Sequence, residues 1–318
     1  MQTQYGLRLR AARRASSGAG SETWFLCCDE GDYVLKLPDK SAVNHPELEP
    51  ELCVFLRENG IPACDFLKNR DGSFLSADAD GRIFTVQRRF SGYTPAWNCA
   101  PEELLLESSE LLGKIHQVLR AYPALSEGIG AAFFANMTPR RAAESYRWSL
   151  ETARRLGDAQ SAAELEWRIG LMERFPAWEP DPARLTCRNT HGDYYLSQFI
   201  CESGRLTAVI DWTAACVHPV IWELTRSFAY GAPCCAEGRL DRRLFARCVE
   251  AYCRYGTLNA CDLENIWRLY FYQIAVCDYY GQYYTSRAAN REIYLRQARL
   301  ANGLLKNMPA ILRAAEGI

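Results

Sequence analysis

Two acidic residues stand on either side of a short predicted hairpin in the segment THGDYYLSQFICESGRLTAVIDW, residues 190–212. Asp193 and Asp211 are eighteen residues apart, and Gln198 lies between them, five residues after Asp193. One carboxylate can accept the proton of a hydroxyl group, and the other can hold Mg²⁺ against the phosphates of a nucleotide. The amide oxygen of Gln198 is a further ligand suited to a hard cation. The spacing indicates a phosphoryl-transfer site.

The hairpin is predicted from the residues between the two acids. Residues 199–201 and 206–210 have the apolar character of strands, and a glycine within residues 202–205 favours a tight turn. The return strand delivers Asp211 to its end, so we expect the two loops to meet at one place. Alone, a His-Gly-Asp turn or an Ile-Asp pair at a strand end is a common structural feature. Their combination in one register favours the site.

These residues resemble the family of aminoglycoside phosphotransferases, choline kinases, type II homoserine kinases and spore-coat CotS-like proteins. Residues 191–193 match its His-Gly-Asp signature, and residues 210–212 match its later Ile-Asp-Trp signature. Gln198 stands where Asn is usual, as it does in maltokinase-like relatives. The carbonyl oxygen is the same in both side chains, although the extra methylene of Gln shifts its position.

The resemblance implies an α+β fold distantly related to protein kinases, with two lobes. A small β-rich N-lobe with one helix would span residues 1–90 and bind the nucleotide. A larger, mainly helical C-lobe would span residues 91–318 and carry the catalytic loop, the metal site and the acceptor pocket. A length of 318 residues and a hydrophobic content of 48% are ample for two cores.

The resemblance also implies roles for individual residues in transferring the γ-phosphate of ATP to a hydroxyl group of a small molecule. Asp193 would orient and deprotonate the hydroxyl, and Gln198 with Asp211 would hold Mg²⁺. His191 and Glu223 would fix the geometry of the loop by hydrogen bonds. An acid in a helical first turn, favoured by the helix dipole, is a simpler explanation for Glu223, and the two are compatible.

A nucleotide-binding lobe requires a loop that approaches the phosphates closely. Strands are predicted over residues 5–14 and 24–30, and the loop between them carries Gly18, Gly20 and Ser21. The glycines free the backbone to turn over phosphate oxygens. The loop lacks the Gly-Lys-Ser/Thr ending of a Walker A motif, which disfavours a P-loop protein. A plain surface turn is the alternative.

A third predicted strand, residues 32–37, carries Lys36 among apolar residues. In the family, this lysine contacts the α- and β-phosphates and pairs with an acid on the following helix. That helix is predicted over residues 46–60, and the family spacing favours Glu49 as the partner, with Glu51 as the alternative. A lysine that protects an edge strand against aggregation is the other explanation for Lys36.

The remaining elements follow the order expected of such a fold. A strand within RIFTVQRRFSGYTP leads into a connector, and Arg88 to Phe90 would form the hinge where main-chain groups meet adenine. A plain strand followed by a loop describes the same residues equally well. Helical periodicity predicts the C-lobe, with helices over residues 101–123, 139–173, 240–256, 261–284 and 287–316. His116 falls on this pattern and is expected to be a core or groove residue.

Composition narrows the class of protein further. A net charge of −1 removes the basic surface expected of a nucleic-acid binder, and no apolar stretch is long enough to span a membrane. No signal peptide is recognised, so we expect a cytoplasmic protein. The fourteen cysteines show no zinc spacing and are expected to be reduced thiols.

The acceptor should bind in the helical lobe, where aromatic residues are densest over residues 266–284. Such helices are usually core, so a binding role for Asp278, Tyr279 and Tyr280 is the minor expectation. The sequence leaves the acceptor and the oligomeric state open. A catalytically silent relative with a structural or spore-coat role is the alternative function, suggested by Gln198 and by a tyrosine at residue 195 where relatives often have His.

Overall fold

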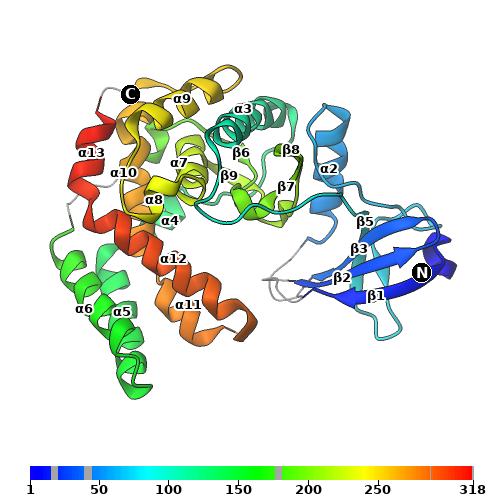
Figure 1. The fold of residues 1–318 in the computed structure, drawn as a ribbon, viewed down its shortest axis with the longest axis horizontal. Helices are drawn as coiled ribbons and strands as arrows, with labels where there is room; N and C mark the ends of the chain where they lie inside the picture. The colour runs from blue at the N-terminus through cyan, green and yellow to red at the C-terminus, as the bar shows by residue number, and fades with distance from the viewer. Residues whose placement is uncertain (16–20, 39–44, 176–180, 287, 317–318) are drawn as a thin grey trace. The chain divides into compact units, whose positions relative to one another are not determined.

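The computed structural model describes residues 1–15, 21–38, 45–175, 181–286 and 288–316 (Figure 1). The chain forms two compact units, one of residues 1–95 with 197–215 and the other of residues 96–196 with 216–318. The predicted boundary at residue 90 lies close to the first division of the chain. The hairpin that ends at Asp211 groups with the N-terminal unit, whereas the sequence analysis placed it with residues 91–318.

The first unit is built on a five-stranded antiparallel sheet with the order β1-β2-β3-β5-β4. The strands are β1 Leu9–Arg14, β2 Ser21–Cys28, β3 Gly31–Pro38, β4 Ser76–Ala77 and β5 Ile83–Arg88. The buried core on this sheet consists of Leu7, Leu26, Cys28, Tyr33, Phe84 and Val86. The expected strands are present, but residues 29–30, predicted as the end of the second strand, form the turn between β2 and β3. Residues 5–8 are not part of the first strand, because a short helix, α1 Gln2–Tyr5, ends at Gly6 with φ 72°.

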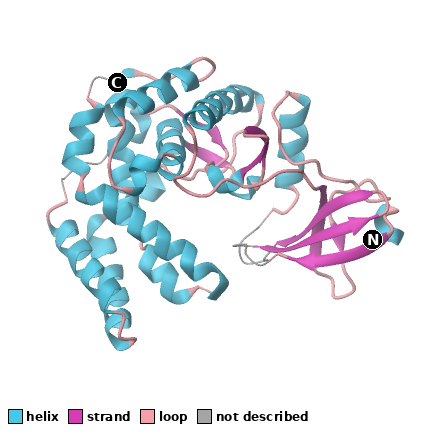
Figure 2. Cartoon of the chain, viewed as in Figure 1, coloured by secondary structure: helices cyan, strands magenta, loops and turns pink. Residues whose placement is uncertain are grey.

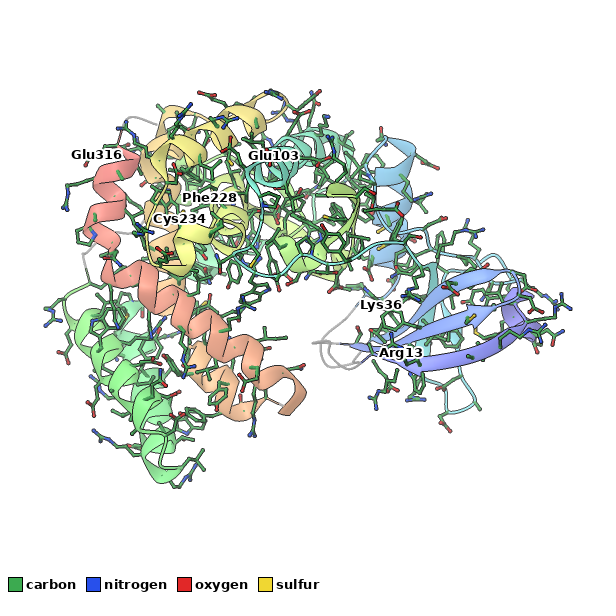
Figure 3. All side chains as sticks on the ribbon, viewed as in Figure 1. Arg13, Lys36, Glu103, Phe228, Cys234 and Glu316 are labelled. Carbon is green, nitrogen blue, oxygen red and sulfur yellow. The ribbon has the colours of Figure 1, made fainter. Side chains whose placement is uncertain are left out.

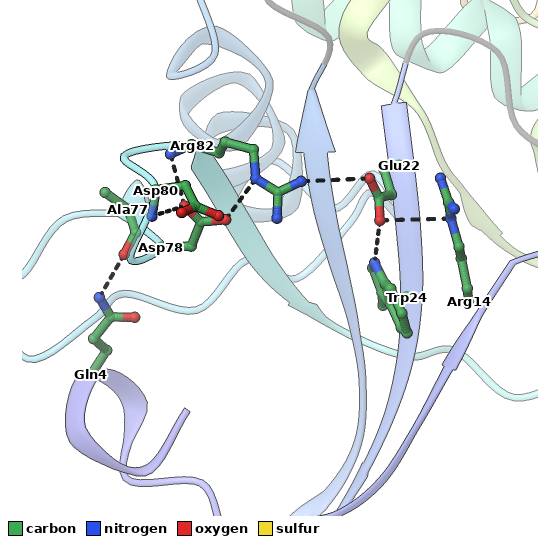
Figure 4. Close-up of polar contacts among 8 residues, drawn as sticks. All are labelled: Gln4, Arg14, Glu22, Trp24, Ala77, Asp78, Asp80 and Arg82. Carbon is green, nitrogen blue, oxygen red and sulfur yellow. Dashed lines mark hydrogen bonds and ion pairs between the residues drawn. The ribbon is translucent and has the colours of Figure 1, made fainter.

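Polar side chains contact one another within and between strands of this sheet (Figure 4). Glu22 on β2 accepts a hydrogen bond from Trp24 Nε1 at 3.0 Å and lies 3.6 Å from Arg14 Nε on β1. Arg82, which precedes β5, reaches the same carboxylate at 3.8 Å and also pairs with Asp78 at 2.8 Å. The arginines of these pairs are exposed and the acids half-buried, so the pairs contribute little to stability and mainly keep the sheet surface polar.

One helix and one hairpin complete the first unit. Helix α2 Leu48–Glu58 buries Leu52, Cys53 and Leu56, and the chain leaves it through Gly60, whose φ is 78°. Strands β7 Phe199–Glu202 and β8 Arg205–Val209 form the hairpin that the sequence predicted. Its two-residue turn has positive φ at Ser203 (51°) and Gly204 (79°), the pattern of a type I′ turn that matches the twist of the strands.

The second unit is mainly helical (Figure 2). Its helices are α3 Glu102–Val118, α4 Ala131–Asn136, α5 Pro139–Arg155, α6 Ala159–Glu173, α7 Val220–Gly231, α8 Pro233–Ala236, α9 Arg242–Cys253, α10 Ala260–Val276, α11 Tyr279–Thr285, α12 Ala288–Lys306 and α13 Met308–Ala315. The side chain of Phe228 on α7, which Figure 3 labels, packs against Phe245 on α9 with ring centroids 4.9 Å apart. No helix within the described residues has the length and apolarity to span a bilayer.

Three of the predicted helical ranges are divided into two helices by local signals. Residues 139–173 break at Gly157, where φ is 71°, and Asp158 caps the next helix by accepting from Ser161 N–H at 3.1 Å. The range 261–284 breaks before α11, and residues 287–316 divide between α12 and α13. The sequence analysis also missed a two-stranded sheet of β6 Cys187–Thr190 and β9 Cys216–Pro219.

Candidate active site

The predicted catalytic loop follows strand β6 in the second unit. His191 is fully buried, and its Nδ1 accepts a hydrogen bond from the backbone N–H of Asp193 at 3.2 Å. Gly192 between them has φ 78°, a conformation that glycine adopts without strain. The loop therefore presents the Asp193 side chain, 32% exposed, from a backbone fixed by the buried imidazole.

Glu223 on α7 lies under this loop and is fully buried. Its carboxylate accepts from the N–H of His191 at 3.3 Å, from the N–H of Tyr194 at 3.4 Å and from His116 Nε2 at 2.9 Å. Burial by itself opposes ionisation, but the hydrogen bond and charge of His116, with further histidines nearby, lower the pKa of Glu223 below its ordinary value. An ionised Glu223 thus anchors the loop, in keeping with the bracing role predicted for it.

His116 is buried in the same network, as the sequence analysis expected for a core residue. Its Nδ1 lies 2.9 Å from the hydroxyl of Tyr252, so both ring nitrogens have partners. The imidazole therefore supports Glu223 from inside the unit, and Glu223 in turn supports the loop.

Arg226 on α7 contacts this loop, and sequence reasoning missed it. Its Nη2 donates to Asp193 Oδ1 at 2.6 Å, and its side chain is 9% exposed. The signal for it was the spacing on the predicted helix, because residues three apart share a helix face and Glu223 was already assigned to the loop. One face of α7 thus holds the loop backbone through Glu223 and the Asp193 side chain through Arg226.

In the first unit, Lys36 contacts two acids. Its Nζ lies 3.4 Å from Glu49 Oε1 and 3.2 Å from Asp211 Oδ1, and its side chain is 12% exposed (Figure 3 labels Lys36). Burial opposes its charge, but the carboxylates of Glu49 and Asp211 outweigh burial and raise the pKa of Lys36 above its ordinary value. Strand β3, which carries Lys36, has neighbours on both sides in the sheet. The alternative that Lys36 protects an edge strand is therefore wrong.

The phase of helix α2 decides between the two candidate partners of Lys36. Glu49 precedes the buried residues Leu52, Cys53 and Leu56 by three, four and seven positions, so it shares their face. Glu49 is 7% exposed, whereas Glu51 points to solvent. The ion pair that the sequence left open between the two acids is made by Glu49.

Asp211 has a backbone conformation that is unusual for a residue other than glycine. Its φ is 64° and its ψ is 66°, in the left-handed region. Neighbouring contacts hold it there. The N–H of the next residue, the fully buried Trp212, donates to Glu49 Oε1 at 3.0 Å, and Thr213 Oγ1 donates to Asp211 Oδ1 at 3.1 Å. Strained residues of this kind persist where the surroundings over-determine them, which is common at functional sites.

Gln198 lies beside this segment in the same unit. Its backbone oxygen accepts from the N–H of Ile210 at 2.9 Å, which places it opposite the residue before Asp211, and it is 8% exposed. A carboxylate and an amide oxygen fit Mg²⁺, which keeps several waters and shares the rest of its shell with phosphate. Within the part of the chain that is described, no group of three or more His, Cys, Asp and Glu residues forms an all-protein metal cage.

The other predicted nucleotide contacts are less defined. Gly18 and Gly20 lie outside the described residues, while Ser21 begins β2 opposite Pro38. Arg88 ends β5, with its backbone N–H bonded to Asp65 at 2.8 Å and its side chain paired with the same residue at 3.2 Å. Because that N–H is used inside the unit, an adenine contact would need other main-chain groups of the segment that ends at Phe90. The hinge stays a prediction.

The aromatic segment of the second unit, residues 266–284, is largely buried, and a core role was the main expectation for it. Asp278 caps α11 by accepting from Gly281 N–H at 2.7 Å, and Ser149 Oγ also donates to it at 3.2 Å. Tyr279 is 8% exposed and Tyr280 is fully buried. These contacts support packing and capping as their role.

Comparison with known proteins agrees with this reading of the motifs. The phosphotransferase enzyme family (APH) matches residues 11–260. A homoserine kinase from Pseudomonas aeruginosa (strain UCBPP-PA14) is 22% identical over 263 residues, which cover 81% of this chain and 76% of that protein. A homoserine kinase from Methylobacillus flagellatus is 23% identical over 212 residues, covering 66% of this chain and 60% of that protein.

Solved structures share the fold at low sequence identity. An amicoumacin kinase in complex with AMP-PNP and Ca²⁺ matches with a TM-score of 0.63 at 11% identity, covering 95% of this chain and 90% of that one. A spectinomycin phosphotransferase in complex with ADP and spectinomycin matches with a TM-score of 0.61 at 14% identity, covering 99% and 95%. The predicted α+β, protein-kinase-like fold is confirmed. The chain belongs to the phosphotransferase enzyme family, as its motifs predicted.

Proposed function

We propose that the protein transfers the γ-phosphoryl group of ATP to a hydroxyl group of a small molecule, with Asp193 as the base and Lys36 as a phosphate-binding residue. The observation that carries the proposal is the cluster in which Lys36, with its side chain 12% exposed, contacts both Glu49 and Asp211. A lysine held by one acid and adjacent to a second, strained acid is the arrangement that a kinase needs to bind phosphates beside a metal.

The proposed reaction forms a bond between the acceptor oxygen and the γ-phosphorus while the bond to the bridging oxygen of ADP breaks. The proton of the hydroxyl passes to Asp193 and later to solvent. Lys36 binds phosphate oxygens, and Glu49 keeps its ammonium group in place. Asp211 and Gln198 would hold Mg²⁺, which when bound neutralises the charge of the phosphates.

The named relatives suggest which acceptors to test first. The curated relatives are homoserine kinases, and the solved structures of similar fold include a spectinomycin phosphotransferase, so homoserine and spectinomycin are the first acceptors of the panel. We expect a small hydroxyl compound and a cytoplasmic location. A catalytically silent role is the weaker alternative, because Lys36, Glu49, Asp193 and Asp211 are all present. Tyr195, one of the two residues that suggested this alternative, packs against the guanidinium group of Arg226.

The test measures ADP release with this panel in the presence and absence of Mg²⁺. We expect turnover with at least one acceptor that requires Mg²⁺, and we expect Mg-ATP to raise the melting temperature because it binds the folded state. Asp211→Ala should abolish both effects. Absence of binding and turnover across the panel in folded protein would favour the silent alternative. A thermal shift by ATP that survives both Mg²⁺ removal and Asp211→Ala would contradict the metal assignment alone.

A further inference from the structure

We infer that Arg226 is a positioning residue for the proposed base, holding the carboxylate of Asp193 in the orientation that accepts the proton. The inference rests on the proposed function, since it assigns Arg226 a role in the same reaction. Its basis is the contact of 2.6 Å between Arg226 Nη2 and Asp193 Oδ1, which joins helix α7 to the loop. Charge-assisted hydrogen bonds of this kind are short and directional.

The guanidinium group of Arg226 is itself held by aromatic rings. Its central carbon lies 4.5 Å from the ring centroid of Tyr195, 4.9 Å from that of Tyr230 and 5.5 Å from that of Trp222. Trp97 packs edge-on against Tyr195 at 5.6 Å and against Tyr230 at 4.7 Å. Arginine packs on such faces through its planar guanidinium group, so these rings hold the group from other sides than Asp193 does. We call these four rings the aromatic clamp.

The charge of Arg226 explains its ion pair with Asp193. A cation with a side chain only 9% exposed requires a compensating anion, and Asp193 is the acid paired with it. Burial opposes the charge, but Asp193 outweighs burial, and the pKa of Arg226 is raised. Within the described residues, Arg226 Nη1 has no hydrogen-bond partner. Nη2 therefore carries the ion pair to Asp193, and an arginine side chain stays protonated throughout the reaction.

The consequence for the reaction concerns orientation. A carboxylate on a loop can rotate about its Cβ–Cγ bond, and each wrong orientation lowers the fraction of complexes ready to react. Glu223 fixes the loop backbone, and Arg226, one helical turn further along α7, fixes the side chain. Because this contact concerns the acceptor side, its loss should lower kcat and leave the affinity for Mg-ATP unchanged.

A second buried arginine provides a matched control. Arg168 on α6 is fully buried, and its guanidinium carbon lies 5.4 Å from the ring of Tyr146. Its hydrogen bonds within the described residues go to Asn302 at 2.7 Å, to the hydroxyl of Tyr146 at 2.8 Å and to the carbonyl of Ile274 at 3.0 Å. Arg168→Met removes the same charge from a similar aromatic environment, in a place with no assigned role in the reaction.

The first experiment measures kcat, the KM values for ATP and acceptor, and the melting temperature for four single variants and one double variant. Arg226→Met should lower kcat by about 10- to 100-fold with little change in the affinity for Mg-ATP. Arg226→Lys, which keeps the charge but loses the planar fork, should retain part of the rate. Arg168→Met should lower the melting temperature and keep kcat. Adding Arg226→Met to Asp193→Asn should lower kcat little further, because residues that act as a unit are not additive.

Chemical rescue separates positioning from folding. In Arg226→Ala, added guanidinium ion should restore part of kcat, whereas it should restore nothing in Asp193→Asn and should not raise kcat in Arg168→Ala. A folded Arg226→Met or Arg226→Lys protein with wild-type kcat would overturn the inference. So would a loss confined to ATP affinity, or a full additional loss in the double variant. Lack of turnover by wild-type protein would instead overturn the proposed function and this inference together.

Discussion

The two units of the molecule hold their site carboxylates by different means. In the first unit, Asp211 has a strained left-handed backbone that is kept in place by Lys36, Thr213 and the Trp212 N–H bond to Glu49. In the second unit, Asp193 is not among the described non-glycine residues with positive φ. Its position depends on buried side chains, namely His191 within the loop and Glu223 and Arg226 on α7.

The difference corresponds to the chemistry proposed for each acid. A carboxylate that shares a metal with phosphates must be fixed as a whole, and a backbone constraint does this directly. A base must also keep a defined direction of its lone pairs while it takes up a proton, which side-chain hydrogen bonds can tune. A substitution at Asp193 should therefore leave the affinity for Mg-ATP intact, and a substitution in the Lys36 cluster should leave the orientation of Asp193 intact.

The largest effect is expected at the base. Asp193→Asn should lower kcat by about 10²- to 10⁴-fold, the usual contribution of a positioned general base. The affinity for Mg-ATP, measured by calorimetry, should stay near the wild-type value because the proposed nucleotide contacts belong to the first unit. A variant that keeps kcat but loses ATP affinity would make Asp193 a ligand residue and would remove the separation between the two units.

The next effect concerns Lys36 and its partner. Glu49→Gln should lower kcat/KM for ATP by about 10- to 100-fold, because Lys36 loses the charge that positions it and Trp212 N–H loses an ionised acceptor. Glu51→Gln is the matched control on the same helix, and its exposed side chain should make it neutral. Steady-state kinetics over a range of ATP concentrations provides the measurement. Equal effects of the two substitutions would contradict the assigned pair.

The sequence predicted the parts of the site that depend on local patterns. Motifs put forward Lys36, Asp193 and Asp211, whose roles stay predictions, and the hairpin that was predicted from its glycine turn is present. The phase of α2 also distinguishes Glu49 from Glu51, because only Glu49 shares the buried face. Helical periodicity applied to the sequence is therefore enough to select Glu49 over Glu51 as the partner of Lys36.

The features that sequence reasoning missed depend on contacts between distant segments. Strands β6 and β9 are four residues each and polar in part, so their pairing is decided by tertiary context rather than by strand propensity. Arg226 lies 33 residues from Asp193, and a single arginine on an apolar helix does not reveal its partner. Arg226 follows Glu223 by three residues and so shares its helix face. This spacing points to a contact with the loop only once that face of α7 is known to support the loop.

A smaller effect, dependent on pH, is expected in the second unit. The pKa of Glu223 is below its ordinary value of 4.5, so its ionisation stabilises the fold above that pH and the contribution is lost as the pH falls below it. Glu223→Gln should cost about 2 kcal/mol near neutral pH by weakening hydrogen bonds to a buried charged group. Denaturation curves should show that the gap between wild type and Glu223→Gln narrows on acidification. A gap that widens below pH 4.5 would contradict the ionised state assigned to Glu223.

The smallest effect isolates the backbone strain itself. Asp211→Ala and Asp211→Gly both remove the carboxylate, so their difference in stability reports the cost of the left-handed conformation. At Asp211, Gly should be more stable than Ala by about 1 kcal/mol, because a Cβ is unfavourable at φ 64°. At Asp193, where φ is not positive, the order should reverse, with Ala more stable than Gly by about 0.5 kcal/mol because Gly leaves the unfolded chain more freedom. Chemical denaturation of the four nucleotide-free variants measures both differences. The same sign at both positions would mean that the two units hold their acids alike, and the contrast between them would fail.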